Sequence, residues 1–449
     1  MKIARNLCIK YSVFILSALL TSGGALLHGT AFAADETFSK TIIAVPGGLN
    51  SFDIGFVDPQ IGLYFLADRT NKTVDQVKTS DNSITQLAVG SFVGVQTGTN
   101  TSGPNGVITA NDHKEVWAAD GVLCNNAQNA CGSTTAATQT SRIQVIDLKT
   151  GKVTHTIDNG GQRRADELCE DPQHNLVLLA NDDALDLFLT FISTKSYKIV
   201  GKIHLDGSDP NAQNIKATNG IEQCQWSPRT GKFYLAIPEV AGTGANTVPG
   251  AVLEINPASM KVQKVFPIDF GFSAGPPATA DCLGPQGLAI GPQREILLGC
   301  SNAGKGTVII DELDGSLIRN LDGLNGNDEV WYNPGDNHYF LAGSNHIGGP
   351  ILGVVDQSPD ANDNEDASVA TAAGSHSVAA DPVKNQVYVP GNKAATTLCG
   401  GSNGCIAVFT AASDDPGVCT GNGTPANGQG KQGDPGFLRA VCPDNNGHP

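Results

Sequence analysis

A hairpin-like segment recurs seven times along this 449-residue chain. In its clearest copy, residues 374–390 (GSHSVAADPVKNQVYVP), a short apolar stretch is followed by an Asp381-Pro382 turn and then by a second apolar stretch. Two such stretches around a polar turn predict a pair of antiparallel strands. The turns fall at positions 59, 112, 172, 228, 292, 334 and 382, and each has a proline there except Asp112. A spacing of 42 to 64 residues between turns, with two strands in each unit, is typical of β-propeller blades.

A second hairpin follows the first in most units. Residues 142–148 (RIQVIDL) and 153–157 flank the polar turn KTGK, and the same arrangement begins at Leu187, Ala251 and Thr307. Strands rich in β-branched residues on either side of a short polar turn form antiparallel hairpins. The sequence therefore predicts an all-β protein, a seven-bladed propeller with four antiparallel strands in each blade.

The two ends of the repeat array predict how the ring closes. The last unit has only one clear outer strand, residues 405–410, and residues 41–45 (TIIAV) precede the first unit without a hairpin of their own. We expect this N-terminal segment to complete the last blade, because strand exchange removes the free edges at the seam. The propeller would span residues 34–410, and the Gly-, Asp- and Pro-rich residues 411–449 would form a C-terminal tail with too few apolar groups to fold.

Residues 1–33 have the pattern of a signal peptide. Three cations precede an apolar core, and Ala31-Phe32-Ala33 fits the small-x-small cleavage rule. We expect an exported, periplasmic or secreted monomer with no membrane span. The leader has three cations and no carboxylate, so its removal takes the net charge from −16 to −19. This charge argues against nucleic acid or an anionic membrane as partner and is compatible with a cationic ligand.

Ten cysteines remain once Cys8 leaves with the leader, an even number that favours disulfides in an oxidising compartment. The sequence does not fix their connectivity, and a thiolate metal site is the alternative, although no C-x-x-C occurs. The natural pairs by spacing and by place in the repeat are Cys124–Cys131, Cys169–Cys224, Cys282–Cys300, Cys399–Cys405 and Cys419–Cys442.

Ionisable residues recur at the start of the first strand of each repeat, where the strands of a propeller line its central channel. The position six residues before each turn is occupied by Asp53, Gly106, Asp166, Glu222, Gln286, Asp328 and His376. Converging carboxylates repel one another, and a divalent cation or a shared proton resolves the repulsion. We expect Asp53, Asp166, Glu222 and Asp328 to hold a cation, Ca²⁺ above all, because oxygen ligands dominate. In a catalytic reading, His376 is a general base, and Asp166 or Glu222 activates water.

The turns carry a family resemblance. The pattern D-P-x-x-x-x-Φ-Y-Φ, as in residues 381–389, together with the outer turns at 147–152, resembles the YVTN/NHL-type propellers of exported bacterial proteins. The strand entries at residues 104–107, 218–221 and 285–288 are similar to those of the gluconolactonase/senescence-marker family, which has six blades where this chain predicts seven. That second resemblance implies that Asn105, Asn219 and Gln286 contact a ligand at the channel mouth. Arg164, in the one cationic pair near this mouth, could hold a carboxylate ligand.

Two functions from different classes follow. In the first, the protein is an exported propeller that binds a small ligand, a divalent cation or a protein partner at its channel face, without turnover. In the second, it is a metal-dependent hydrolase or lyase acting on a small ester or lactone. A third possibility for the ring of ionisable residues is a channel lining whose polar side chains hydrogen-bond only to one another and to water, with no ligand and no catalysis. The three tryptophans lie within inner hairpins and are expected to pack between blades.

Overall fold

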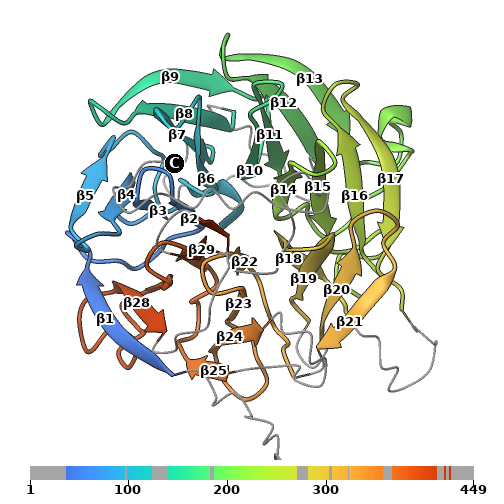
Figure 1. Cartoon of the computed structure of the whole chain (residues 1–449). Helices are drawn as coiled ribbons and strands as arrows, with labels where there is room; N and C mark the ends of the chain where they lie inside the picture. The colour runs from blue at the N-terminus through green and yellow to red at the C-terminus, as the bar shows by residue number, and fades with distance from the viewer. Residues whose placement is uncertain are drawn as a thin grey trace, which may run out of the picture. The chain divides into compact units, whose positions relative to one another are not determined.

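The computed structural model describes residues 37–96, 99–123, 140–182, 187–270, 282–302, 306–321, 323–356 and 367–411, and the short strands β29 (Cys419–Thr420) and β30 (Thr424–Pro425). Seven four-stranded antiparallel sheets follow one another around a centre (Figure 1). The predicted all-β, seven-bladed propeller is therefore confirmed. Two 3₁₀ turns, η1 (Thr99–Thr101) and η2 (Pro210–Ala212), are the helical elements among the described residues. None of these residues forms a helix that is long and apolar enough to cross a bilayer.

The first four blades follow the chain in order from the centre outward. Their strands are, for blade one, β2 (Gly55–Asp58), β3 (Leu63–Asp68), β4 (Thr73–Lys78) and β5 (Ile84–Leu87); for blade two, β6 (Val107–Ala110), β7 (Glu115–Asp120), β8 (Arg142–Asp147) and β9 (Lys152–Asp158); for blade three, β10 (Ala165–Asp171), β11 (Leu176–Asn181), β12 (Phe188–Ser193) and β13 (Lys198–His204); and for blade four, β14 (Cys224–Ser227), β15 (Lys232–Ile237), β16 (Ala251–Asn256) and β17 (Lys261–Pro267).

The last three blades complete the ring. Their strands are, for blade five, β18 (Pro285–Ile290), β19 (Glu295–Cys300), β20 (Thr307–Asp311) and β21 (Leu317–Leu321); for blade six, β22 (Val330–Asn333), β23 (His338–Gly343), β24 (Ile351–Asp356) and β25 (Ala367–Ala370); and for blade seven, β26 (Ala379–Asp381), β27 (Gln386–Gly391), β28 (Cys405–Ala411) and β1 (Phe38–Ala44). Each innermost strand contacts the innermost strand of the next blade, and β26 contacts β2.

Strand β1 closes the ring as predicted. It pairs antiparallel with β28 along its whole length, with Thr41 opposite Val408. The strand is three residues longer at its N-terminal end than the apolar pattern indicated, because its outward face is exposed and needs no apolar side chains. Blade seven is therefore built from both ends of the described chain, which leaves no unpaired seam in the sheet.

Burial explains why the second strands read as continuous apolar runs. Each blade is packed between two neighbours, so both faces of its second strand are covered; every residue of β7, β11 and β23 is buried. The outermost strands have one covered face and a free edge. Most residues of β9 and β13 are accordingly exposed, with partly or fully buried residues between them. The core is thus a series of layers between blades, with tyrosines such as Tyr64 and Tyr388 stacked across the boundary of blades one and seven.

The recurring Asp-Pro turn has a local cause. The aspartate side chain accepts a hydrogen bond from the backbone N–H two residues on, at 3.0 Å for Asp58 and 2.9 Å for Asp171 and Asp381. Blade two departs from the pattern because Asn111, Asp112 and His113 all have positive φ angles of 56°, 60° and 57°. Proline is locked near −65° and cannot take this conformation. The missing proline at 112 therefore marks a different turn rather than a weak repeat.

Three of the predicted disulfides are present, Cys169–Cys224, Cys282–Cys300 and Cys399–Cys405. The first joins the innermost strands of blades three and four. Cys124, Cys131 and Cys442 lie outside the described residues, so the other two pairs stay predictions. The predicted signal peptide and nearly all of the predicted tail beyond Ala411 also lie outside them, so both stay predictions.

Candidate functional site

The predicted ring of ionisable residues does meet at one end of the channel. Backbone hydrogen bonds join neighbouring blades at this level, from Gly106 N to Asp166 O at 3.1 Å and from Glu329 N to His376 O at 3.1 Å. A Cβ on Gly106 would lie 2.0 Å from that Asp166 oxygen, so only glycine fits in blade two. We call this end the charged mouth and define it by the residues Asp53, Arg69, Arg164, Asp166, Asp182, Glu222, Asp328 and His376.

Asp53 is neutralised by protein cations on both of its oxygens. Arg69 donates to Oδ2, Arg164 Nη2 lies 3.3 Å from the same oxygen, and His376 Nε2 lies 3.1 Å from Oδ1. Burial alone would raise the pKa of this carboxyl, but Arg69, Arg164 and His376 outweigh it and hold the pKa of Asp53 below its ordinary value. Arginine thus supplies, at this position, the positive charge that the sequence analysis assigned to a metal ion.

His376 is held between two acceptors. Its Nδ1 lies 2.8 Å from the carbonyl oxygen of Gly374 while Nε2 faces Asp53, and the ring stacks on Phe52 with centroids 5.0 Å apart. Burial lowers the pKa of this imidazole, but the Asp53 hydrogen bond and the charge of Asp328 raise it by more. Two acceptors on one ring favour the imidazolium form, which donates protons. The role of His376 as a general base stays a prediction.

Three carboxyl groups converge beside this cluster. One oxygen each of Asp166, Asp182 and Glu222 lies within 4.8 Å of the others. Arg164 reaches into the group, with Nη2 2.6 Å from Asp166 Oδ2 and Nη1 3.7 Å from Asp182 Oδ2. Burial raises the pKa of Asp166 to about 8 against the opposing charge of Arg164. Burial and Asp182 likewise raise the pKa of Glu222, so protons and one arginine offset the repulsion.

The residues predicted to bind a ligand are largely engaged by the protein itself. Asn105 accepts hydrogen bonds from Arg69 and donates one of 2.6 Å to the carbonyl of Ala165. Gln286 donates to Glu222 at 3.2 Å, and Asn219 donates to Asn246 at 2.7 Å. Asp328 is half-buried, and burial raises its pKa in spite of the nearby His376. The metal, catalytic and ligand-binding roles of the predicted residues stay predictions.

A second layer of polar residues lies one position further along the strands. The position five residues before each turn is polar in four blades, with Glu167, Gln223, Glu329 and Ser377. Glu167 and Glu329 lie side by side in this layer. Burial, the charges of Glu329 and Asp166, and the hydrogen bond with Glu329 raise the pKa of Glu167 well above its ordinary value. Burial raises the pKa of Glu329 to about 8. Gln223 accepts from the N–H of Leu288 at 2.7 Å and donates to the carbonyl of Val330 at 3.2 Å.

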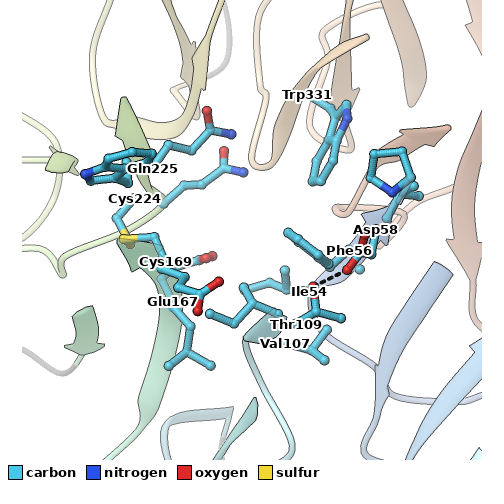
Figure 2. A pocket seen from close by; sticks show the side chains of 18 of the residues that line it. Ile54, Phe56, Asp58, Val107, Thr109, Glu167, Cys169, Cys224, Gln225 and Trp331 are labelled. Carbon is cyan, nitrogen blue, oxygen red and sulfur yellow. Dashed lines mark hydrogen bonds between the residues drawn. A yellow bond between two sulfur atoms is a disulfide. The ribbon is translucent and has the colours of Figure 1, made fainter. Parts of the chain in front are cut away.

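Below this layer, toward the turn end of the first strands, the channel opens into a cavity of about 460 Å³. Blades one, two, three, four and six line it, with mostly apolar walls (Figure 2). The Cys169–Cys224 disulfide forms part of the wall, and Phe56 and Trp331 meet edge to face at 5.7 Å. The expectation that all tryptophans only pack between blades is thus incomplete. Trp117 is fully buried, whereas Trp226 and Trp331 are half-buried and also line this cavity.

Sequence reasoning missed Arg69 and the Glu167–Glu329 pair. Arg69 directly follows the last residue of β3, a position that the repeat alignment places at the charged mouth. Reading this position together with the one five before each turn would have found them. No local pattern indicated the cavity, because its volume depends on how far apart the innermost strands of five different blades are held.

Comparisons with known proteins support the fold. No protein-family model and no curated protein matches the chain. Among solved structures, the WD40 repeats of RRP9 match 83% of this chain and 97% of their own at a TM-score of 0.54 and 6% identity. The match to the Neurospora crassa Pan2 WD40 domain covers 85% of this chain and 98% of that domain, with a TM-score of 0.51 and 9% identity. The match to Kuenenia stuttgartiensis hydrazine synthase covers 81% of this chain and 95% of that chain, with a TM-score of 0.51 and 16% identity. At these identities the likeness shows the β-propeller fold, a common binding or scaffold module, and not the YVTN/NHL-type family.

Proposed function

We propose that this protein is a ligand-binding β-propeller that holds a small molecule, or one side chain of a protein partner, in the cavity at the turn end of its channel. The single observation that carries this proposal is the cavity itself. Its 460 Å³ lies within the usual range of ligand sites, and apolar walls with a few convergent polar groups are typical of such sites. The charged mouth, by contrast, is largely occupied by its own arginines.

The binding test uses N-phenyl-1-naphthylamine, a neutral dye that fluoresces in apolar cavities. We expect saturable binding that quenches the emission of Trp331. The quench should be reduced in Trp331→Phe and retained in Trp117→Phe, because Trp117 is fully buried and is not among the lining residues. Ile54→Trp fills the cavity and is expected to weaken binding about tenfold or more. Val383→Trp adds the same side chain at an exposed turn and should leave binding unchanged. Equal dye binding by the two variants would refute the proposal.

A divalent cation at the charged mouth is the second candidate, and the convergence of Asp166, Asp182 and Glu222 favours it. Asp166 Oδ1 is buried without a hydrogen-bond partner among the described residues, so an oxygen ligand is available there. The set differs from the predicted one: Asp182 joins it, Asp53 is bound by Arg69, and Asp328 is not among the three converging residues. If a cation binds, hydrolysis or lyase chemistry on an ester or lactone beside His376 remains the catalytic alternative.

Calcium is expected to stabilise the protein if this second candidate holds. Ca²⁺ at one hundred times its Kd would raise the free energy of unfolding by about 2.7 kcal/mol, and a chelator would reverse the gain. The gain should vanish in Asp182→Asn and persist in Asp112→Asn, whose carboxylate lies on an exposed turn. Thermal unfolding that responds to neither Ca²⁺, Mg²⁺ nor chelator would exclude the cation. Hydrolysis of a lactone panel would be measured only on protein that shows the gain.

The site of action proposed is outside the cytoplasm. Three disulfides among the described residues favour an oxidising compartment, in agreement with the predicted leader.

A further inference from the structure

We propose that the cavity recognises a primary ammonium group carried on an apolar stem, either a small amine or a lysine side chain, and that Glu167 is its anchor. This inference rests on the proposed function, because it names the chemical class of the ligand for the same cavity. It is carried by a buried carboxyl oxygen that faces the cavity, by the acidic residues of the cavity lining and by its aromatic wall.

The buried carboxyl oxygen belongs to Glu167, a residue that is only 4% exposed. Apart from the neighbouring carboxyl of Glu329, its Oε1 has no hydrogen-bond partner among the described residues, and in Figure 2 the carboxyl group points from β10 toward the open centre of the cavity. A buried polar atom without a partner costs free energy. An ammonium N–H is a charge-assisted donor that would satisfy this oxygen, whereas a hydrocarbon would leave it unpaired.

The residue composition of the lining favours a cation. Three acidic residues line the cavity, Asp58, Glu167 and Glu170, and none of the described lining residues is lysine or arginine. The one basic lining residue, His113, is already bound to Asp58, with Nδ1 2.6 Å from Oδ2. The chain as a whole carries a net charge of −16, which attracts cations toward the entrance.

The aromatic wall favours an apolar stem. Phe56 and Trp331 are half-buried, and Figure 2 shows the Trp331 ring directed into the cavity. Apolar side chains such as Ile54 and Val107 cover the opposite wall. A stem lying between these walls would be removed from water, and the faces of aromatic rings also attract a nearby cation. An anion of the same shape would lie beside the carboxyl groups of Glu167 and Glu170, with no lysine or arginine among the described lining residues to pair with it.

The test compares three probes of matched shape as competitors for N-phenyl-1-naphthylamine: 2-phenylethylammonium, neutral propylbenzene and 3-phenylpropanoate. We expect the ammonium to bind about tenfold more tightly than the neutral probe, and the carboxylate to bind most weakly. A peptide with one lysine, compared with its norleucine counterpart, identifies the source. Preference for the lysine peptide assigns the site to a protein partner, and preference for the free amine alone assigns it to a small molecule.

Variants connect the preference to the carboxyl pair. Glu167→Gln/Glu329→Gln removes both carboxyls and should reduce the ammonium preference to less than about twofold while the dye still binds. Glu254→Gln removes an equally buried carboxylate from outer strand β16, where it pairs with Lys264, and should keep the preference.

The outcomes separate this inference from the proposed function. If the dye binds and propylbenzene or the carboxylate competes as well as the ammonium, the ligand class is wrong and the binding function stands. If neither the dye nor any probe binds the wild-type protein, the proposed function fails with it. The wild-type comparison decides the question even if the double variant does not fold.

Discussion

Replacement of Arg69 by methionine is expected to lower the free energy of unfolding by about 3 kcal/mol, because it breaks a buried ion pair from one side. The Arg69 side chain is 5% exposed and donates to Asp53, to Asn105 and to the carbonyl oxygen of Phe52. Methionine keeps much of the apolar stem and removes every donor. Urea denaturation of the wild-type and variant proteins measures the loss.

Two comparisons make this prediction specific. Lys114→Met removes a cation from an exposed pair with Asp112 and should have no measurable effect. The double variant Arg69→Met/Asp53→Asn should lose less free energy of unfolding than the sum of the two single losses. Each single variant leaves one charge of the pair without its partner, whereas the double variant removes both charges. Strictly additive losses would mean that Arg69 stabilises the fold by its packing alone.

The pH dependence follows from the lowered pKa of Asp53. A carboxyl whose pKa is lower in the folded state stabilises that state above its unfolded value of 3.8 and loses this contribution as the pH falls through the folded value. Arg69→Met removes the largest of the three lowering charges, so it raises the folded pKa and reduces the difference. The gap between the wild-type and variant proteins should therefore be widest near neutral pH and shrink below pH 3.8.

The sequence predicted the architecture well because a propeller repeats its local rules. Two strands around each Asp-Pro turn, a second hairpin outside them and the unpaired segment at residues 41–45 were enough to predict blades and closure. The convergence of Asp53, Asp166, Glu222, Asp328 and His376 followed from the same alignment, since equivalent positions of a ring meet at its axis. The position of a residue within its repeat therefore predicts where that residue lies in the ring.

Side-chain chemistry did not follow from the repeat. Arg69 and Arg164 occur once each, in different places relative to their blades, yet both reach Asp53. Their choice of partner depends on the direction of long side chains, which the alignment does not contain. The metal expectation arose for this reason: repulsion among carboxylates was foreseen, and the residues that relieve part of it were not. The cavity was missed because no single blade contains it.

Removal of the disulfide between blades three and four is expected to have the largest effect of the three described bridges. Cys169 and Cys224 are separated by 55 residues, against 18 for Cys282–Cys300 and 6 for Cys399–Cys405. The loss of loop-closure entropy in the unfolded chain then corresponds to about 4, 3 and 2 kcal/mol respectively. Double alanine variants, compared by urea denaturation, measure this order.

All six sulfurs belong to buried residues, so the volume lost is similar in each variant and the differences report on chain entropy. Cys169→Ala/Cys224→Ala alone should also weaken dye binding, because only this bridge lies in the cavity wall among the three. Equal losses in all three variants would show that local packing, and not the length of chain that each bridge closes, sets the stability of this ring.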